Sequence, residues 1–158
     1  DLHKRHHYVV VVDDFDDVDD DEDGDYGYLL DIMLLLSVLA MMAMAKKIKG
    51  QTMIAPSELN GLVVVARDQI QTRGKAELGG KTVLDSLDAI VQHTSDKTDL
   101  EDIRAAAIEA VDEALAAFRG KPATMGRARM FGEKRVGLDD PGMLAMKFIV
   151  YALAGKNV

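Results

Sequence analysis

The stretch from Thr98 to Gly120, TDLEDIRAAAIEAVDEALAAFRG, decides the fold class. Thr98 and Glu101 have the spacing of a capping box, which predicts that a helix begins here. Gly120 follows the last apolar residue, where a glycine typically ends a helix. The apolar residues between these signals recur at helical spacing and predict one buried stripe, formed by Leu100, Ile103, Ala107, Val111, Leu115 and Phe118.

Similar signals on either side predict further helices. Ser57 can cap a helix that ends at Gly74, a second helix starts near Lys81, and a last helix begins at Pro141 and ends at Gly155. The only strand-like run is YVVVV at 8–12, and no repeat is visible. We therefore expect a single all-α domain over residues 1–158, an antiparallel helical bundle or barrel.

The most apolar run is YLLDIMLLLSVLAMMAMA at 28–45, which has 18 residues and contains Asp31. A membrane span needs about 20 largely uncharged residues, so we expect no membrane partner. The run predicts a helix that is buried on most sides. Its four methionines, at 33, 41, 42 and 44, are expected to fill the core.

Charge and cysteine content narrow the class of protein. The net charge is −8, but residues 13–25 alone hold nine Asp and one Glu, leaving 17 acids and 19 bases elsewhere. No basic face is evident, so we expect no nucleic-acid partner. The chain has no cysteine, which is compatible with a reducing compartment, and we expect a cytoplasmic location.

The acidic run predicts a metal site. Closely spaced carboxylates repel one another, and Mg²⁺ or Ca²⁺ bound by their oxygens would offset that repulsion. Gly24 would let the backbone turn so that Asp23 and Asp25 point the same way. A calcium loop counted from Asp19 is a weaker alternative, because Leu30 stands where its bidentate Glu is required. A solvated acidic loop is the other alternative.

Two glycine-rich segments predict phosphate contacts. Residues 73–82, RGKAELGGKT, end at a predicted helix start, where amides can bind an anion; a flexible interhelix loop is the alternative. Residues 126–142, GRARMFGEKRVGLDDPG, hold four cations and end in Asp140-Pro141-Gly142. Arginine suits bidentate phosphate contact. With the acidic run, these segments imply a nucleotide polyphosphate with Mg²⁺.

The stretches RGKAELGGKTVLDSLDAI and GRARMFGEKRVGLDDPG, together with DGDYG at 23–27, resemble the L subunit of dihydroxyacetone kinases from about residue 56 to 154. The resemblance implies an antiparallel eight-helix barrel, with fewer helices allowed here, that holds ADP or ATP through two Mg²⁺. It implies a partner K subunit that binds dihydroxyacetone, and in bacterial phosphotransferase-linked versions a phosphohistidine carrier protein. An oligomer is compatible with it.

The resemblance also assigns site residues. The metal ligands would be Asp23, Asp25 and Asp19, the last beside Val18, on which the family's first aspartate falls. The nucleotide would contact Tyr26, Gly27, Tyr28, Leu29, Gly74, Val83, Arg127, Asp140, Pro141 and Gly142. Residues 1–36 otherwise differ from the family, Gly80 replaces an Asp, and the family's Gly-Gly-x-Ser-Gly loop is absent.

Two functional hypotheses follow. The first is an ADP/ATP-Mg²⁺ subunit that passes a phosphoryl group to a triose on the K subunit. Because such catalysis is mostly positioning and charge neutralisation, we expect no catalytic side chain in this chain. The second is a non-catalytic or degenerate helical module that binds a nucleotide or calcium, which the missing Gly-Ser loop favours.

Overall fold

The computed structural model describes residues 23–125, 133–134 and 136–158, with the backbone alone for residues 23–33. The described residues form the helices α1 (Asp23–Lys47), α2 (Pro56–Gly74), α3 (Val83–Thr94), α4 (Leu100–Arg119) and α5 (Pro141–Leu153), without a strand. The all-α prediction is confirmed. The run at 8–12 lies outside the described residues.

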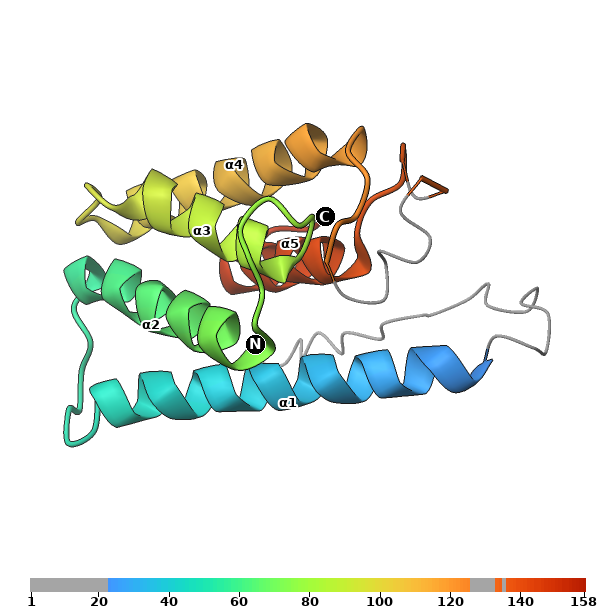
Figure 1. The fold of residues 1–158 in the computed structure, drawn as a ribbon. Coiled ribbons are helices and arrows are strands. Elements are labelled where there is room, and N and C mark those ends of the chain that lie inside the picture. Colours follow the sequence, from blue (N-terminus) through green and yellow to red (C-terminus); the bar gives the residue numbers. More distant parts are fainter. Residues whose placement is uncertain (1–22, 126–132, 135) are drawn as a thin grey trace, which may run out of the picture.

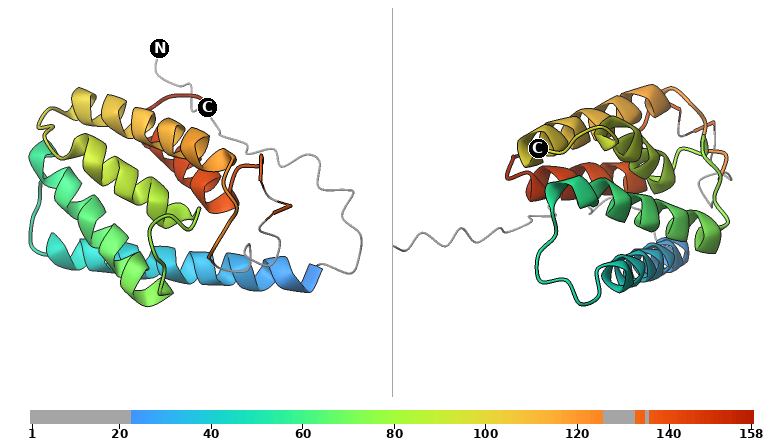
Figure 2. Two further views of the ribbon diagram at one scale, coloured as in Figure 1. Left: turned by 45° about the horizontal axis from the view of Figure 1, so that its top comes forward. Right: turned by 90° about the vertical axis from the view of Figure 1, so that its left-hand side faces the viewer.

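Successive helices run antiparallel and pack side by side (Figure 1). α3 is central and contacts α2, α4 and α5, whereas α1 packs mainly against α2. Leu84, Val111 and Met143, from α3, α4 and α5, are fully buried. Because successive helices are antiparallel, the α2–α3 and α4–α5 connections lie at the same end of the bundle (Figure 2). We call the residues 75–82 and the described part of 120–140 the loop end.

Two helix starts differ from the prediction by one or two residues. α2 begins at Pro56 rather than after a Ser57 cap, and the Ala55 amide donates to Glu58 Oε2 at 2.9 Å. Proline suits this first position because it has no amide that needs a partner. α4 is capped by Asp99 rather than Thr98, and Asp99 Oδ1 accepts the Glu101 amide at 2.9 Å. An aspartate side chain is a good cap, and its negative charge interacts favourably with the positive end of the helix dipole.

The other predicted boundaries hold closely. α2 ends at Gly74, α3 starts at Val83 just after the expected position, and α5 begins at Pro141. Gly155 follows the last helix with φ +67°, a conformation that glycine adopts easily. The buried face of α4 is broader than the predicted stripe, since it includes Ala106, Ala110 and Ala114 while Leu100 is exposed. This breadth follows from α4 packing against both α3 and α5.

α1 is helical as predicted, but it is not buried on most sides. Among the side chains described from residue 34 onward, one stripe of α1, formed by Leu36, Ala40 and Met44, packs into the core shared with α2 and α3. Five apolar side chains are between 46% and 63% exposed, namely Leu34, Leu35, Val38, Met41 and Met42. The prediction was wrong because α1 has essentially one neighbour, α2. Within the described residues, no helix is long and apolar enough to cross a membrane.

Candidate functional site

The described residues that the sequence singles out for nucleotide binding lie in the loop end or at the helix ends beside it. These residues come from three helices that start or end here, and α1 also begins at this end (Figure 1). They are Gly74 at the end of α2, Val83 at the start of α3, and Asp140, Pro141 and Gly142 at the start of α5. Residues 26–29 belong to the first turns of α1.

The backbone amides before α3 are hydrogen-bonded to a carboxylate of the protein itself, that of Asp85. Asp85 accepts hydrogen bonds from the amides of Gly79 at 2.6 Å and Thr82 at 2.8 Å. The Thr82 hydroxyl accepts the Leu84 amide at 3.2 Å, which completes a capping box. The amides of Gly79 and Thr82 are therefore engaged inside the protein rather than offered to a phosphate. The sequence signal for this cap is Thr82-x-x-Asp85, which has the spacing of a capping box.

Gly80 allows two connections to touch. A Cβ added at Gly80 would lie 2.5 Å from Met125 Cγ and 3.0 Å from Met125 Cβ. The Thr124 amide donates to the Gly80 carbonyl at 3.3 Å. Because these clashing atoms lie close to the backbone, the segment 121–125 would have to move to accommodate a side chain. This contact accounts for the glycine where the resembling family has an aspartate.

Gly74 lies beside α1. A Cβ added there would lie 3.4 Å from Leu36 Cδ1 of α1, an ordinary van der Waals contact, so packing does not require a glycine here. Asp140 caps α5, since its Oδ1 accepts the Met143 amide at 3.0 Å. Gly142 is buried in the first turn of α5. Because α5 begins at the loop end, the positive end of its helix dipole lies there.

An ion pair that the sequence did not predict joins α4 to the segment before α5. The Arg119 guanidinium donates to both carboxylate oxygens of Asp139, at 2.8 and 2.7 Å. The hydrogen-bonded guanidinium holds the pKa of Asp139 below its usual value, and the nearby charges of Lys81 and Lys147 act in the same direction. This pair fixes the residue next to the Asp140 cap.

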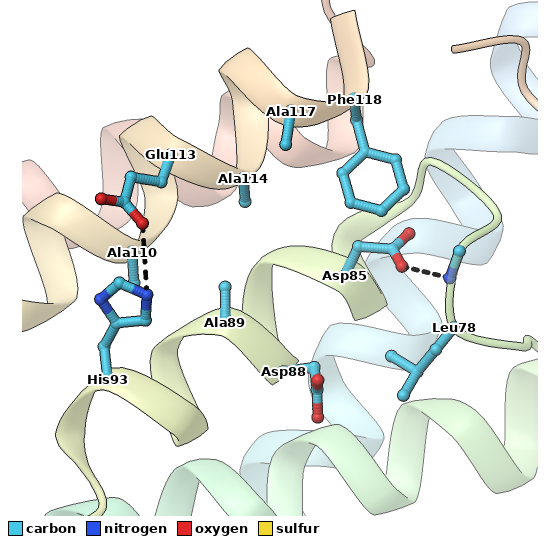
Figure 3. Close-up of a pocket in the computed structure, with 11 residues that line it drawn as sticks. Leu78, Asp85, Asp88, Ala89, His93, Ala110, Glu113, Ala114, Ala117 and Phe118 are labelled. Carbon is cyan, nitrogen blue, oxygen red and sulfur yellow. Dashed lines mark hydrogen bonds and ion pairs between the residues drawn. The ribbon is translucent and has the colours of Figure 1, made fainter.

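A cavity of about 370 Å³ lies between α3 and α4 and reaches Leu78 and Gly79 of the loop end (Figure 3). His93 and Glu113 face each other across it, with 3.5 Å between Nε2 and Oε2. Asp85 and Asp88 also line it, and Asp88 pairs with Arg67 at 2.9 Å. None of the described side chains assigned to the nucleotide lines this cavity, and its three carboxylates disfavour a phosphate.

The predicted metal ligands lie at the edge of the described chain. Asp19 and the predicted phosphate contact Arg127 fall outside it, and Asp23 and Asp25 begin α1. The backbone is helical from Asp23 rather than turning at Gly24, and residues two apart in a helix do not face each other. In the part of the chain that the structure describes, no three His, Asp or Glu side chains gather as a metal site would require. The three-aspartate site stays a prediction.

Comparison with known proteins places the chain in a family. The DAK2 domain matches residues 34–155. The chain belongs to the DAK2 domain family. The match includes every described position of the loop end and begins after the predicted metal ligands and residues 26–29.

Curated relatives of this DAK2 domain carry related names. One is the ADP-binding subunit DhaL of a PEP-dependent dihydroxyacetone kinase 1 from Listeria innocua serovar 6a, 29% identical over 121 residues, covering 75% of this chain and 56% of the relative. Another is the ADP-binding subunit DhaL of a PTS-dependent dihydroxyacetone kinase from Lactococcus lactis subsp. lactis, 31% identical over 114 residues, covering 72% and 53%. The chain thus spans about half the length of these relatives.

Proposed function

We propose that this DAK2 domain binds ADP or ATP at its loop end and serves as the nucleotide-binding subunit of a dihydroxyacetone kinase. One observation carries the proposal. The family-matched segments that the sequence assigns to the nucleotide are distant along the chain, yet their described parts meet at one end of the bundle. The relatives named as ADP-binding subunits support the choice of ligand.

Within this site, the start of α5 is the stronger candidate for the phosphate end. Its first turn carries a helix dipole, and the preceding segment 126–135 contains Arg127, Arg129, Lys134 and Arg135. The start of α3 is less suited, because Asp85 already occupies the amides of Gly79 and Thr82. We assign phosphate contact to Arg127, and close backbone approach to Val83 and Gly142.

Two Mg²⁺ ions would be held by Asp19, Asp23 and Asp25. Carboxylate oxygens are the ligands that Mg²⁺ prefers, so the residue types fit, and joint coordination by Asp23 and Asp25 would require the first turn of α1 to open. No competing cluster exists among the side chains described from residue 34 onward. The ions would neutralise the phosphate charge beside an acidic segment that otherwise repels it.

Phosphoryl transfer would require a partner. The dihydroxyacetone would be held on a K subunit, a phosphohistidine carrier protein would recharge the bound ADP, and the reaction would take place in the cytoplasm. This chain would contribute nucleotide positioning and charge neutralisation rather than a general base.

A second candidate function is a nucleotide-binding module without phosphoryl transfer. The absence of a Gly-Gly-x-Ser-Gly loop in the sequence favours it, since nothing equivalent would cover the phosphates. Phosphoryl transfer after addition of a K subunit separates the two functions, because only the first would produce dihydroxyacetone phosphate.

The test begins with the purified protein. It is denatured, the released nucleotide and divalent metal are measured, and the refolded or apo protein is titrated calorimetrically with ADP in the presence of Mg²⁺. Arg127→Ala should weaken ADP binding, whereas Arg104→Ala should not, because Arg104 lies near the opposite end of α4 beside Glu101. Absence of ADP from the preparation together with no heat on titration would refute the proposal.

A further inference from the structure

Lys81 is a lysine in an unusual environment. Lys81 is only 2% exposed to solvent. Its backbone has φ +61°, in the left-handed region that residues with a side chain rarely adopt. It follows Gly79, at φ +89°, and Gly80, which is buried against Met125. Burying an ammonium and straining its backbone are both unfavourable, so the contacts of this side chain must offset both.

Two of those contacts lie at the end of α4. Lys81 Nζ donates to the carbonyl of Arg119 at 3.2 Å and to the carbonyl of Lys121 at 3.0 Å. The last carbonyls of a helix lack intrahelical partners and carry the negative end of its dipole. Lys81 therefore caps α4 from a different connection of the chain, with the charge sign that this helix end favours.

The same carbonyl joins a third segment. The Arg119 carbonyl also accepts the Gly137 amide at 2.8 Å, while the Arg119 side chain holds Asp139. The Thr124 amide reaches back to the Gly80 carbonyl at 3.3 Å. Residues 79–82, 119–125 and 137–140 are thus connected through the main chain around a single buried ammonium.

We propose that Lys81 is the positioning residue of the loop end: its ammonium holds the segment after α4 and the segment before α5 in the arrangement that the nucleotide requires, without touching the nucleotide. The consequence for ligand affinity rests on the proposed function. The consequence for the loop end itself does not, because the carbonyl contacts are present in the protein without ligand.

The test compares two lysines of the same connection. Lys75 is also left-handed, at φ +48°, but it is exposed and caps α2 through its own backbone. Lys81→Met and Lys75→Met therefore place the same side chain on similarly strained backbone, and only the first removes an ammonium from the α4 carbonyls. Each full-length variant is examined by amide hydrogen exchange without ligand and by titration with ADP and Mg²⁺, well below the unfolding temperature.

In Lys81→Met, the amides of Thr124 and Gly137 should exchange about tenfold faster, and ADP should bind about tenfold more weakly, as expected for losing hydrogen bonds from a charged donor. The amides of Leu84 and Val111 should be less affected, and Lys75→Met should resemble the wild type. A purely structural role would instead accelerate exchange throughout the core and leave the ADP affinity of the folded fraction unchanged.

Unchanged exchange at Thr124 and Gly137 in Lys81→Met would overturn the proposal. If that variant does not fold, Lys81→Gln, which is shorter and uncharged, is measured in the same way, and wild-type exchange and affinity there would also overturn it. A wild-type protein that binds no ADP would refute the proposed function, while the exchange data would still decide whether Lys81 holds the loop end together.

Discussion

Arg119 and Asp139 form a two-bond ion pair, with donor–acceptor distances of 2.8 and 2.7 Å, that joins the end of α4 to the residue preceding the α5 cap. The pair lies at the loop end, so its loss should affect both stability and the local geometry of Asp140. Neither residue is assigned to the nucleotide or the metal from the sequence. Substituting them therefore tests how the loop end is stabilised without removing a predicted ligand contact.

Asp139→Asn should lower stability near neutral pH, and progressively less as the pH falls into the acid range. The pKa of Asp139 is lowered in the folded protein, mainly by its hydrogen bonds with Arg119. Its contribution is therefore complete above the unfolded value of about 3.9 and is lost as the pH falls through the lower folded pKa. Denaturant titrations at about pH 6 and about pH 3 should show a smaller difference from wild type at the lower pH. Because Arg119 is half exposed, the difference should be small and should shrink with salt.

Asp85→Ala should destabilise the protein by about 2–3 kcal/mol, since two amides lose a charged acceptor. Asp102→Ala is the matched control, because Asp102 also lies in the first turn of its helix but is exposed; it should cost less than about 1 kcal/mol. Sulfate should restore part of the stability of Asp85→Ala by occupying the vacated amides of Gly79 and Thr82. Equal stability of the two variants in urea titrations would contradict the capping role.

Gly80→Ala should destabilise by about 1–3 kcal/mol, as overpacking does, because its Cβ would lie 2.5 Å from Met125 Cγ. Adding Met125→Ala should recover much of this loss, and a double-mutant cycle measures the recovery. Gly120→Ala has no atom within 4 Å of the added Cβ and should change stability by less than about 0.5 kcal/mol. Additive effects of the Gly80 and Met125 changes would argue against the close approach.

Met42→Gln and Met44→Gln test which face of α1 is covered. Met42 is 63% exposed, whereas Met44 packs against the core of α1, α2 and α3. Met42→Gln should change the free energy of unfolding by less than about 0.5 kcal/mol, and Met44→Gln should cost about 1–2 kcal/mol. The free energies of unfolding of both variants are measured by thermal and urea unfolding. A larger loss in Met42→Gln than in Met44→Gln would show that another element covers the Met42 face.

Much of the fold is predictable from sequence because its signals are local. Capping residues, Pro141 and the glycines at 74 and 155 set helix ends through nearby backbone groups, and these boundaries agree within one or two residues. The burial of α1 is not predictable in this way, since an apolar run shows that a helix can be buried but not how many neighbours it has. That number depends on packing between distant segments.

The contacts of the candidate site likewise divide into local ones, which the sequence predicts, and distant ones, which it does not. Thr82 and Asp85 are three residues apart and form a recognisable motif, whereas Arg119 and Asp139 are separated by 20 residues, and Lys81 reaches carbonyls 38 and 40 residues away. Such contacts follow only from the relative placement of α3, α4 and α5. The positions assigned to the nucleotide meet at one end, but the groups that hold this end together were not apparent from their own local sequence.

The attachment of α1 to essentially one neighbour has a thermodynamic consequence. Sub-global opening of the protein should begin with the release of α1 from α2, at a free energy well below that of complete unfolding. If ligands bind between the start of α1 and the loop end, their affinity includes the cost of docking this helix, and their binding should suppress its opening. In this chain, the helix that would carry two of the metal ligands is also the one that has a single main neighbour.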